Sequence, residues 1–226
     1  FVIDNRAGAA GLIGAETVAK GTPDGYTLLL ANAGPSINVP LLKRNAPYKV
    51  DEFTPIVYLG YAPLIIVIHP SIPATNPAEL LSYLKANPGK VNWGSSGNGS
   101  PLHIGLALFQ AATGVNVTHV AYKGAAQALT DAGGGQIQVM HATTVSASGQ
   151  IKAGRVKIIG VASKKRSPVW PNVPTLAESG IKNAEAVAWV GIAAPPKTPR
   201  SIVNKLNAEC NRILLMPDVK QRLDQL

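Results

Sequence analysis

The sequence predicts an α/β fold with two lobes, each a mostly parallel sheet flanked by helices. Short strands that are apolar on both faces alternate with amphipathic helices, and most glycine- and serine-rich loops follow strands. The segments 59–70 and 186–197 are predicted to be two crossover strands that join the lobes. This division assigns residues 1–62 and 192–226 to lobe I and residues 63–191 to lobe II.

The first section of the chain is predicted to form strands at 1–4, 27–32 and 53–70, and helices at 12–20 and 40–45. Apolar runs bounded by turn residues predict the strands, and apolar residues at helical spacing predict the helices. A break at Gly60–Pro63 divides the third strand region into two halves. Because mature proteins rarely begin inside a strand, we expect that N-terminal structure precedes this sequence.

The middle section repeats this alternation with clearer helix boundaries. Asn76 is predicted to cap a helix that begins at Pro77, with Glu79 completing a capping box. Ser100 is predicted to cap a second helix, which ends at Gly114. Helices are also expected at 124–135 and 146–154, strands at 91–96, 115–122, 137–143 and 156–163, and a second capping box between Thr175 and Glu178.

The closing section is predicted to be a strand at 184–196 and then the longest amphipathic helix of the chain. Thr198 is the expected cap of that helix and Pro199 its first residue, and a last short helix is expected to start at Pro217. Cys210 shares the apolar spacing of the long helix, which indicates a core residue rather than a reactive thiol.

Composition excludes several classes of function. The 226 residues carry a net charge of +9, but lysine and arginine are scattered and aromatic residues are only 5%, which argues against a nucleic-acid partner. No apolar run reaches the roughly 18 residues that a membrane-spanning helix needs. The single cysteine cannot form a disulfide or a cysteine-based zinc site within the chain.

A glycine-rich segment near the start resembles a dinucleotide-binding loop. Gly8, Gly11 and Gly14 follow a predicted strand and precede a helix, but their spacing is G-x-x-G-x-x-G rather than G-x-G-x-x-G. The next predicted strand ends in Ala31 and Asn32, where an acidic residue for a ribose would be expected. A tight turn with close helix packing is therefore the preferred interpretation, and a dinucleotide-dependent oxidoreductase stays the alternative.

The stretch WGSSGNGSPLH, residues 93–103, could support three kinds of chemistry. A phosphate-binding P-loop needs a lysine after its glycines, and none follows here. A nucleophile elbow needs G-x-S-x-G, and Asn98 stands where the last glycine belongs. A serine hydrolase also needs a base with an acidic partner, which none of the histidines shows in sequence, so this class remains a second alternative.

An anion-binding loop fits this stretch best. Ser100 as N-cap and Pro101 as first residue place a helix N-terminus, with its free N–H groups and partial positive charge, directly after the loop. The glycines allow the backbone to form a concave set of donors, and Ser95, Ser96 and Asn98 add side-chain donors. The predicted guest is a carboxylate or another small anion.

Other strand ends are polar but almost uncharged. Tyr122 and Lys123 follow one strand, His141 and Thr143 end another, and the segment 31–38 ends a strand of the first lobe. No pair of carboxylates suits acid–base catalysis, and no cluster of histidine, aspartate or glutamate has metal-ligand spacing. The pattern favours binding over catalysis, with no metal and no cofactor.

Several ordered segments resemble one family, the substrate-binding proteins of tripartite tricarboxylate transporters, also called Bug or TctC receptors. The resemblance is carried by VIDNRAGAAGLIGAETVAKGTPDGYTLLL, FTPIVYLG, WGSSGNGSPLH, HVAYKGAAQALTDAGGGQIQVM, IKAGRVKIIGVASKKRSPVWPNVPTLAESG and GIAAPPKTPRSIVNKLNAECNRIL. It implies a monomeric periplasmic receptor of the two-lobed type II binding-protein fold, which closes on a small carboxylate and delivers it to a membrane permease. Family members also begin earlier and end later, so we expect part of the ligand site to lie outside this sequence.

By position, the resemblance places the ligand loops at 32–36, 95–100 and 141–144. Relatives often have an aromatic residue and an aspartate where this chain has His141 and Ala142, so a ligand with an amine is not expected. A plain mono- or dicarboxylate, including an aromatic one, fits better. The predicted ligand-binding residues are Asn32, Ala33, Ser36, Ser95, Ser96, Gly97, Asn98, Gly99, Ser100, Tyr122, His141 and Thr143.

Overall fold

The computed structural model describes residues 2–224 and has an α/β fold. The chain divides into two compact units. Unit 1 comprises Phe1–Tyr61 and Trp189–Leu226, and unit 2 comprises Ala62–Ala188. No helix of the described residues is long and apolar enough to cross a membrane.

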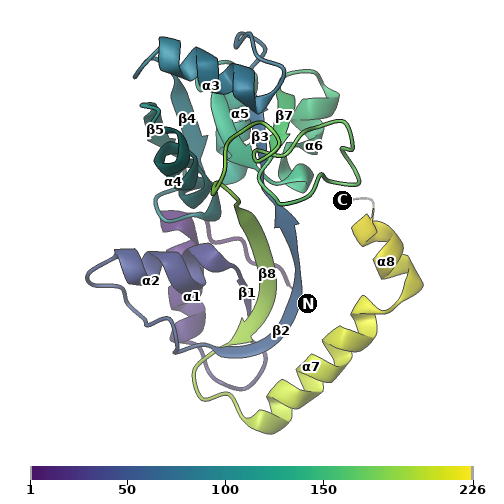
Figure 1. The fold of residues 1–226 in the computed structure, drawn as a ribbon. Coiled ribbons are helices and arrows are strands. Elements are labelled where there is room, and N and C mark those ends of the chain that lie inside the picture. Colours follow the sequence, from purple (N-terminus) through teal and green to yellow (C-terminus); the bar gives the residue numbers. More distant parts are fainter. Residues whose placement is uncertain (1, 225–226) are drawn as a thin grey trace. The chain divides into compact units, whose positions relative to one another are not determined.

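Unit 2 is built on a five-stranded sheet with the order β5-β4-β6-β3-β7 (Figure 1). β4 pairs in parallel with β5 and with β6, whereas β3 pairs antiparallel with β6 and with β7. Four strands therefore run in one direction and only β3 opposes them, as a mostly parallel sheet requires. The strands are β3 (Ile65–Ile68), β4 (Asn92–Ser95), β5 (Thr118–Ala121), β6 (Val139–Ala142) and β7 (Lys157–Val161).

Four helices surround this sheet, and buried aliphatic side chains fill the space between the layers (Figure 1). They are α3 (Pro77–Ala86), α4 (Pro101–Thr113), α5 (Ala125–Gly133) and α6 (Thr144–Lys152). All four residues of β3 are fully buried, because elements of the unit cover both faces of the sheet. Trp93 and Phe109 are the largest of the fully buried side chains, and their rings are 5.0 Å apart.

Helix caps form largely where the sequence predicts them. The Asn76 side chain accepts a hydrogen bond from the Glu79 N–H at 3.0 Å, but the Glu79 carboxylate accepts from Thr75 rather than from Asn76. Gly114 ends α4 with a φ of 70°, a left-handed conformation that favours glycine. α6 begins at Thr144, earlier than the predicted 146–154, because Thr143 caps it.

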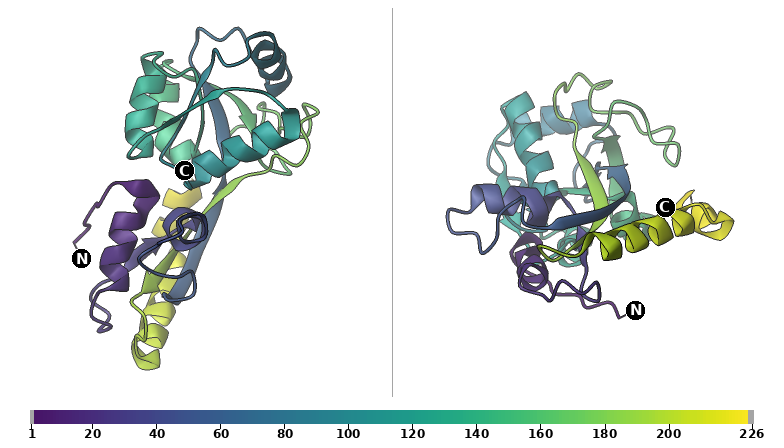
Figure 2. Two further views of the ribbon diagram at one scale, coloured as in Figure 1. Left: turned by 90° about the vertical axis from the view of Figure 1, so that its left-hand side faces the viewer. Right: turned by 90° about the horizontal axis from the view of Figure 1, so that it is seen from below.

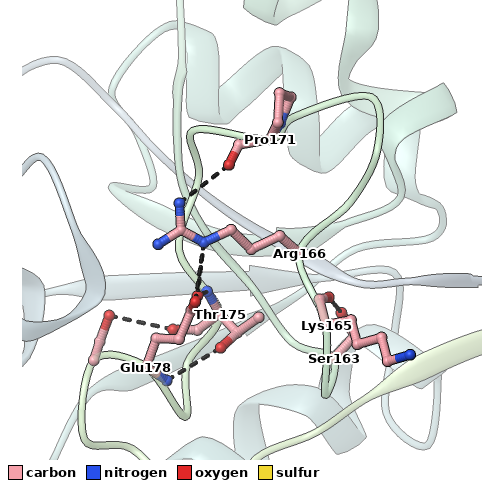
Figure 3. A network of polar contacts seen from close by, with 7 residues as sticks. Ser163, Lys165, Arg166, Pro171, Thr175 and Glu178 are labelled. Carbon is pink, nitrogen blue, oxygen red and sulfur yellow. Dashed lines mark hydrogen bonds and ion pairs between the residues drawn. The ribbon is translucent and has the colours of Figure 1, made fainter.

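The long connection between β7 and β8 is held by a polar network (Figure 3). Thr175 and Glu178 form the predicted reciprocal bonds, with Thr175 N–H donating to the carboxylate and Glu178 N–H donating to the hydroxyl. The segment is nevertheless a turn and not a helix. Arg166 donates to the Glu178 carboxylate and to the Pro171 carbonyl, which ties the two ends of the connection together.

The sheet of unit 1 corrects the prediction of a mostly parallel sheet in each lobe. Its order is β1-β8-β2, and β1 pairs antiparallel with β8. The central residue of β1, Leu30, is 66% exposed between two buried neighbours, a half-exposed pattern that antiparallel strands tolerate. The strands are β1 (Leu29–Ala31), β2 (Thr54–Pro63) and β8 (Val187–Ala194).

The N-terminal part of unit 1 is more helical than predicted. Val2, Ile3 and Asp4 are exposed and form no strand, so the strand predicted at 1–4 is wrong for these described residues; Phe1 lies outside them. These residues pair with no strand of the unit 1 sheet. The polar segment after β1 is a π-helical turn rather than a loop. The elements are the 3-10 turn η1 (Ala9–Gly11), α1 (Leu12–Ala19), η2 (Gly34–Asn38) and α2 (Val39–Leu42).

The C-terminal helices α7 (Arg200–Leu214) and α8 (Pro217–Asp224) follow one another in unit 1 and are coloured yellow in Figure 2. α7 begins one residue later than predicted, and Thr198 does not cap it, because its hydroxyl donates to the Pro195 carbonyl at 2.9 Å. Asn207 ties α7 to β2 through a 2.7 Å bond to the Ile56 carbonyl. Burial and then the Glu209 charge raise the pKa of the partly buried Cys210, so its thiol is not activated.

Candidate functional site

Three helix N-termini meet one edge of the unit 2 sheet. β5, β4 and β6 are neighbours that run in parallel, so their carboxyl ends lie along the same edge. Each strand leads through a short loop into a helix, and the helices begin at Pro101, Ala125 and Thr144. Free N–H groups and the helix dipoles make this edge favourable for an anion. In open α/β sheets ligands bind outside the carboxyl ends of strands.

The loop from Ser95 to Ser100 is the most elaborate of these connections. Gly97 and Gly99 adopt φ values of 118° and 83°, which side chains rarely allow. Ser95 Oγ accepts the Gly97 N–H at 3.2 Å, and the Ser100 hydroxyl caps α4 by accepting the His103 N–H. These bonds fix the orientation of the Ser95 and Ser100 side chains.

Burial separates the members of this loop into two groups. Ser95 and Ser100 are buried, at 0% and 2% exposure, and their hydroxyls bond within the protein. Ser96 is partly exposed and Asn98 is exposed. Of the predicted side-chain donors, Ser96 and Asn98 are therefore the two that a ligand can reach.

Two histidines that sequence reasoning left unassigned lie under this loop. His119 Nε2 is 2.7 Å from Ser95 Oγ, and the Gly99 N–H donates to His103 Nδ1 at 3.1 Å. The two rings stack with centroids 4.3 Å apart. Burial lowers the pKa of both imidazoles, and the neighbouring His103 lowers that of His119 further. His119 pairs with Trp93 in the parallel register of β5 with β4, and this pairing brings the His119 ring beside β4.

The contact between Ser95 and His119 supplies the base that the hydrolase alternative requires, but the geometry does not suit catalysis. The serine is fully buried and its oxygen already accepts the Gly97 N–H. Among residues 2–224, His119 bonds to Ser95, and no carboxylate orients its ring as a base. An inaccessible hydroxyl without an oriented base is no nucleophile.

Tyr122 lies next to the loop with its hydroxyl already engaged. The phenol donates to the Asp131 carboxylate of α5 at 2.8 Å, and the Tyr122 N–H donates to the Ser95 carbonyl at 3.0 Å. Burial, and then the bond to Asp131, raise the pKa of Tyr122 to about 12. The structure therefore gives Tyr122 a role in packing and in holding the loop, and its ligand contact stays a prediction.

His141 and Thr143 end β6 in different ways. The His141 ring is fully buried against Trp93, with centroids 5.3 Å apart, and against Gly105 of α4. Neither ring nitrogen has a hydrogen-bond partner among the described residues, and burial lowers the pKa to about 3. Thr143 caps α6 and exchanges hydrogen bonds with Ser146. The ring of His141 thus offers no exposed atom to a ligand.

The predicted residues of the first lobe lie in unit 1 around η2. Asn32 Oδ1 accepts the Gly34 N–H at 3.0 Å, and Ala33 is the residue before the turn. Ser36 is buried, and its hydroxyl has no partner among the described residues. It lines a hollow of about 790 Å³ that sequence reasoning did not anticipate, together with Phe53, Tyr58, Trp189 and further residues of β1, β2, β8 and α7.

The glycine-rich segment before α1 forms a tight turn, as preferred from the sequence. Gly8 and Gly11 have φ values of 127° and 90°, and an added Cβ at Gly11 would lie 3.1 Å from the Pro35 side chain. These glycines therefore permit close packing of α1 against η2. No group of three or more potential metal-ligating side chains occurs in the part of the chain that the structure describes.

These features define an α/β protein in which three helix N-termini follow the carboxyl ends of neighbouring parallel strands. The chain belongs to the tripartite tricarboxylate transporter receptor family, whose model matches residues 1–226. This is a family of transporter receptors and not of enzymes, as the sequence resemblance predicted. A curated relative from Pseudomonas sp. strain P51, the "UPF0065 protein in tcbD-tcbE intergenic region", is 38% identical over 227 residues, which cover 100% of this chain and 67% of the relative.

Solved structures agree with this assignment and show the fold of periplasmic binding proteins. The periplasmic binding protein BugD has a TM-score of 0.93 at 36% identity, over 99% of this chain and 75% of BugD. R. palustris Rpa4515, solved with adipate, has a TM-score of 0.95 at 33% identity, over 100% and 76% of the chains. MatC from Rhodopseudomonas palustris, with bound malate, has a TM-score of 0.91 at 33% identity, over 98% and 76%.

The chain spans about two thirds of the length of the curated relatives it matches. It covers 64% of a Bordetella pertussis relative that is 36% identical. The activity, substrate and partners of the whole protein are therefore proposed below.

Proposed function

We propose that this protein is a periplasmic solute receptor that captures a small carboxylate and delivers it to the membrane subunits of a tripartite tricarboxylate-type transporter. Membership of the receptor family supports the role, and relatives solved with adipate and with malate support the ligand class. Units 1 and 2 are proposed to be its two lobes, with the lobe boundaries after residues 61 and 188 rather than after the expected residues 62 and 191.

The observation that carries this proposal is the loop from Ser95 to Ser100 at the N-terminus of α4. It leaves Ser96 and Asn98 accessible beside a helix end of partial positive charge, while its other hydroxyls hold the loop in shape. Hydrogen bonds to a charged group contribute about 1.5–3 kcal/mol each, so a few donors can hold a carboxylate without a salt bridge. Asn32–Ser36 are proposed as further contacts from lobe I.

The site favours a ligand without an amine. An ammonium group requires a carboxylate or several oxygen acceptors, and β6 ends in His141 and Ala142, both buried. The Asp131 carboxylate of α5 is already engaged, because it accepts the Tyr122 hydroxyl. A plain mono- or dicarboxylate is therefore the proposed substrate class, and aromatic acids belong to it.

Replacing Ser96 or Asn98 by alanine is expected to weaken the binding of adipate or malate by about 10- to 100-fold each, because each change removes one donor to a charged group. Isothermal titration calorimetry of the purified protein measures this. Ser82→Ala on the exposed face of α3 and Asn172→Ala in the β7–β8 connection are matched controls that should bind as the wild type does. If both site variants kept wild-type affinity, the loop would not be the carboxylate site.

A further inference from the structure

The stacked, partly buried histidines His103 and His119 bond to both ends of the loop from Ser95 to Ser100. His119 meets the Ser95 hydroxyl, where the loop leaves β4, and His103 accepts the Gly99 N–H, just before α4 begins. Only three residues, 96–98, lie between these two attachments. The rings come from different elements, since His103 is the third residue of α4 and His119 lies in β5. The pair therefore fixes the loop to the sheet and to the helix at once.

We propose that His103 and His119 are positioning residues that hold the loop in its carboxylate-binding shape, and that the attachment made by His103 requires a neutral imidazole. This inference rests on the proposed function, because it concerns the same loop. His103 Nδ1 can accept the Gly99 N–H only when that nitrogen carries no proton. Neither histidine is assigned contact with the ligand.

The surroundings keep both rings neutral at neutral pH. Burial lowers the pKa of each, and two charges on rings whose centroids are 4.3 Å apart would repel each other. Among residues 2–224, the titratable group that faces each ring is its partner ring: His119 of β5 stacks on His103 of α4, and His103 lowers the pKa of His119 further. Ser95 of β4 and the Gly99 backbone are the remaining polar neighbours.

Protonation of His103 converts its acceptor into a second donor. The Gly99 N–H then faces an N–H group, so this hydrogen bond is lost and the shape of the loop before α4 changes. Carboxylate affinity is therefore expected to fall as the pH drops below neutral. A histidine that merely attracted the carboxylate would produce the opposite trend, because its positive charge would tighten binding in acid.

Paired variants separate positioning from simple packing. His103→Asn retains an oxygen acceptor near the position of Nδ1 and cannot be protonated, whereas His103→Leu removes the acceptor. At pH 7.5 calorimetry with adipate and malate should show His103→Leu binding about tenfold more weakly than the wild type, and His103→Asn within about threefold of it. His119→Gln should likewise bind better than His119→Leu, because glutamine can still reach the Ser95 hydroxyl.

The pH profile is the decisive readout. Across the pH range in which the His103 ring titrates, the wild type should lose at least about threefold more affinity than His103→Asn, and this comparison cancels titration of the ligand itself. Superimposed profiles, or a wild type that binds more tightly in acid than His103→Asn, would overturn the inference while leaving carboxylate binding intact. A wild type that binds neither ligand at pH 7.5 would overturn the proposed function and the inference together.

A measurement on the wild type alone guards against variants that do not fold. The Gly99 amide resonance should shift over the same pH range in which the His103 ring titrates, because the two groups share a hydrogen bond. A Gly99 amide that stays unchanged through that range would contradict the proposal.

Discussion

Lowering the pH from 7.5 to 5 is expected to reduce the free energy of unfolding by about 2 kcal/mol through His141 alone. The ring is fully buried, its nitrogens have no partner among the described residues, and burial lowers its pKa from 6.5 to about 3. Between these two pKa values the unfolded chain binds a proton that the folded protein excludes. The stabilisation is therefore complete above pH 6.5 and is lost as the pH falls toward 3.

Urea denaturation at a series of pH values measures this effect. His141→Leu should show a flatter pH dependence than the wild type, by about 2 kcal/mol at pH 5, because the titrating group is gone. Met140→Leu, the fully buried neighbour on the same strand, is the matched control and should keep the wild-type slope. Equal slopes for the wild type and His141→Leu would show that the ring is protonated in the folded protein.

Trp93→Ala is expected to lower the free energy of unfolding by about 3–5 kcal/mol, which is the largest effect of any single change considered. The indole is fully buried between the rings of Phe109 and His141, at centroid distances of 5.0 and 5.3 Å. Its removal leaves a cavity between the sheet and α4, which the surrounding side chains can fill only in part.

Thermal and urea unfolding, followed by circular dichroism, check this expectation. Trp93→Phe is the graded control, since it keeps an aromatic ring and removes the indole N–H, which has no partner among the described residues. It should lose less than half as much stability as Trp93→Ala. A Trp93→Ala variant that unfolds like the wild type would mean that the packing between β4 and α4 is not as described.

Local signals in the sequence were sufficient for the helices. Asn76, Ser100 and Gly114 mark the ends of α3 and α4 because each residue type satisfies a backbone group that the helix leaves unpaired. Thr198 shows the limit of such signals. The same hydroxyl can cap a helix or bond to a nearby carbonyl, and here it bonds to Pro195.

The pairing of strands could not be predicted from the sequence. The antiparallel sheet of unit 1 and the contact between Ser95 and His119 both depend on that pairing. Strand direction depends on partners far away in the sequence, so the antiparallel pairing of β1 with β8 left no local mark. The contact between Ser95 and His119 likewise depends on the register of β4 with β5. The sequence correctly predicted that Ser100 caps the helix after the loop, but it did not predict that His103 and His119 bond to the loop.

The burial of His141 shows why the exposure of a polar residue at a strand end cannot be read from the sequence. Strand residues alternate between faces, and register alone decides whether such a side chain meets solvent or a helix. Here the ring packs beneath α4, where Gly105 makes room for it. The polar residue type suggested a ligand contact, whereas its place in the sheet makes it part of the core.

The central claim is that this protein binds a small carboxylate that has no amine. Calorimetric titration of the wild type with adipate, malate and an amino acid such as glutamate at pH 7.5 tests it most directly. Saturable binding of a dicarboxylate, with much weaker or undetectable binding of the amino acid, is the predicted result. Tight binding of the amino acid, with none of either dicarboxylate, would contradict it.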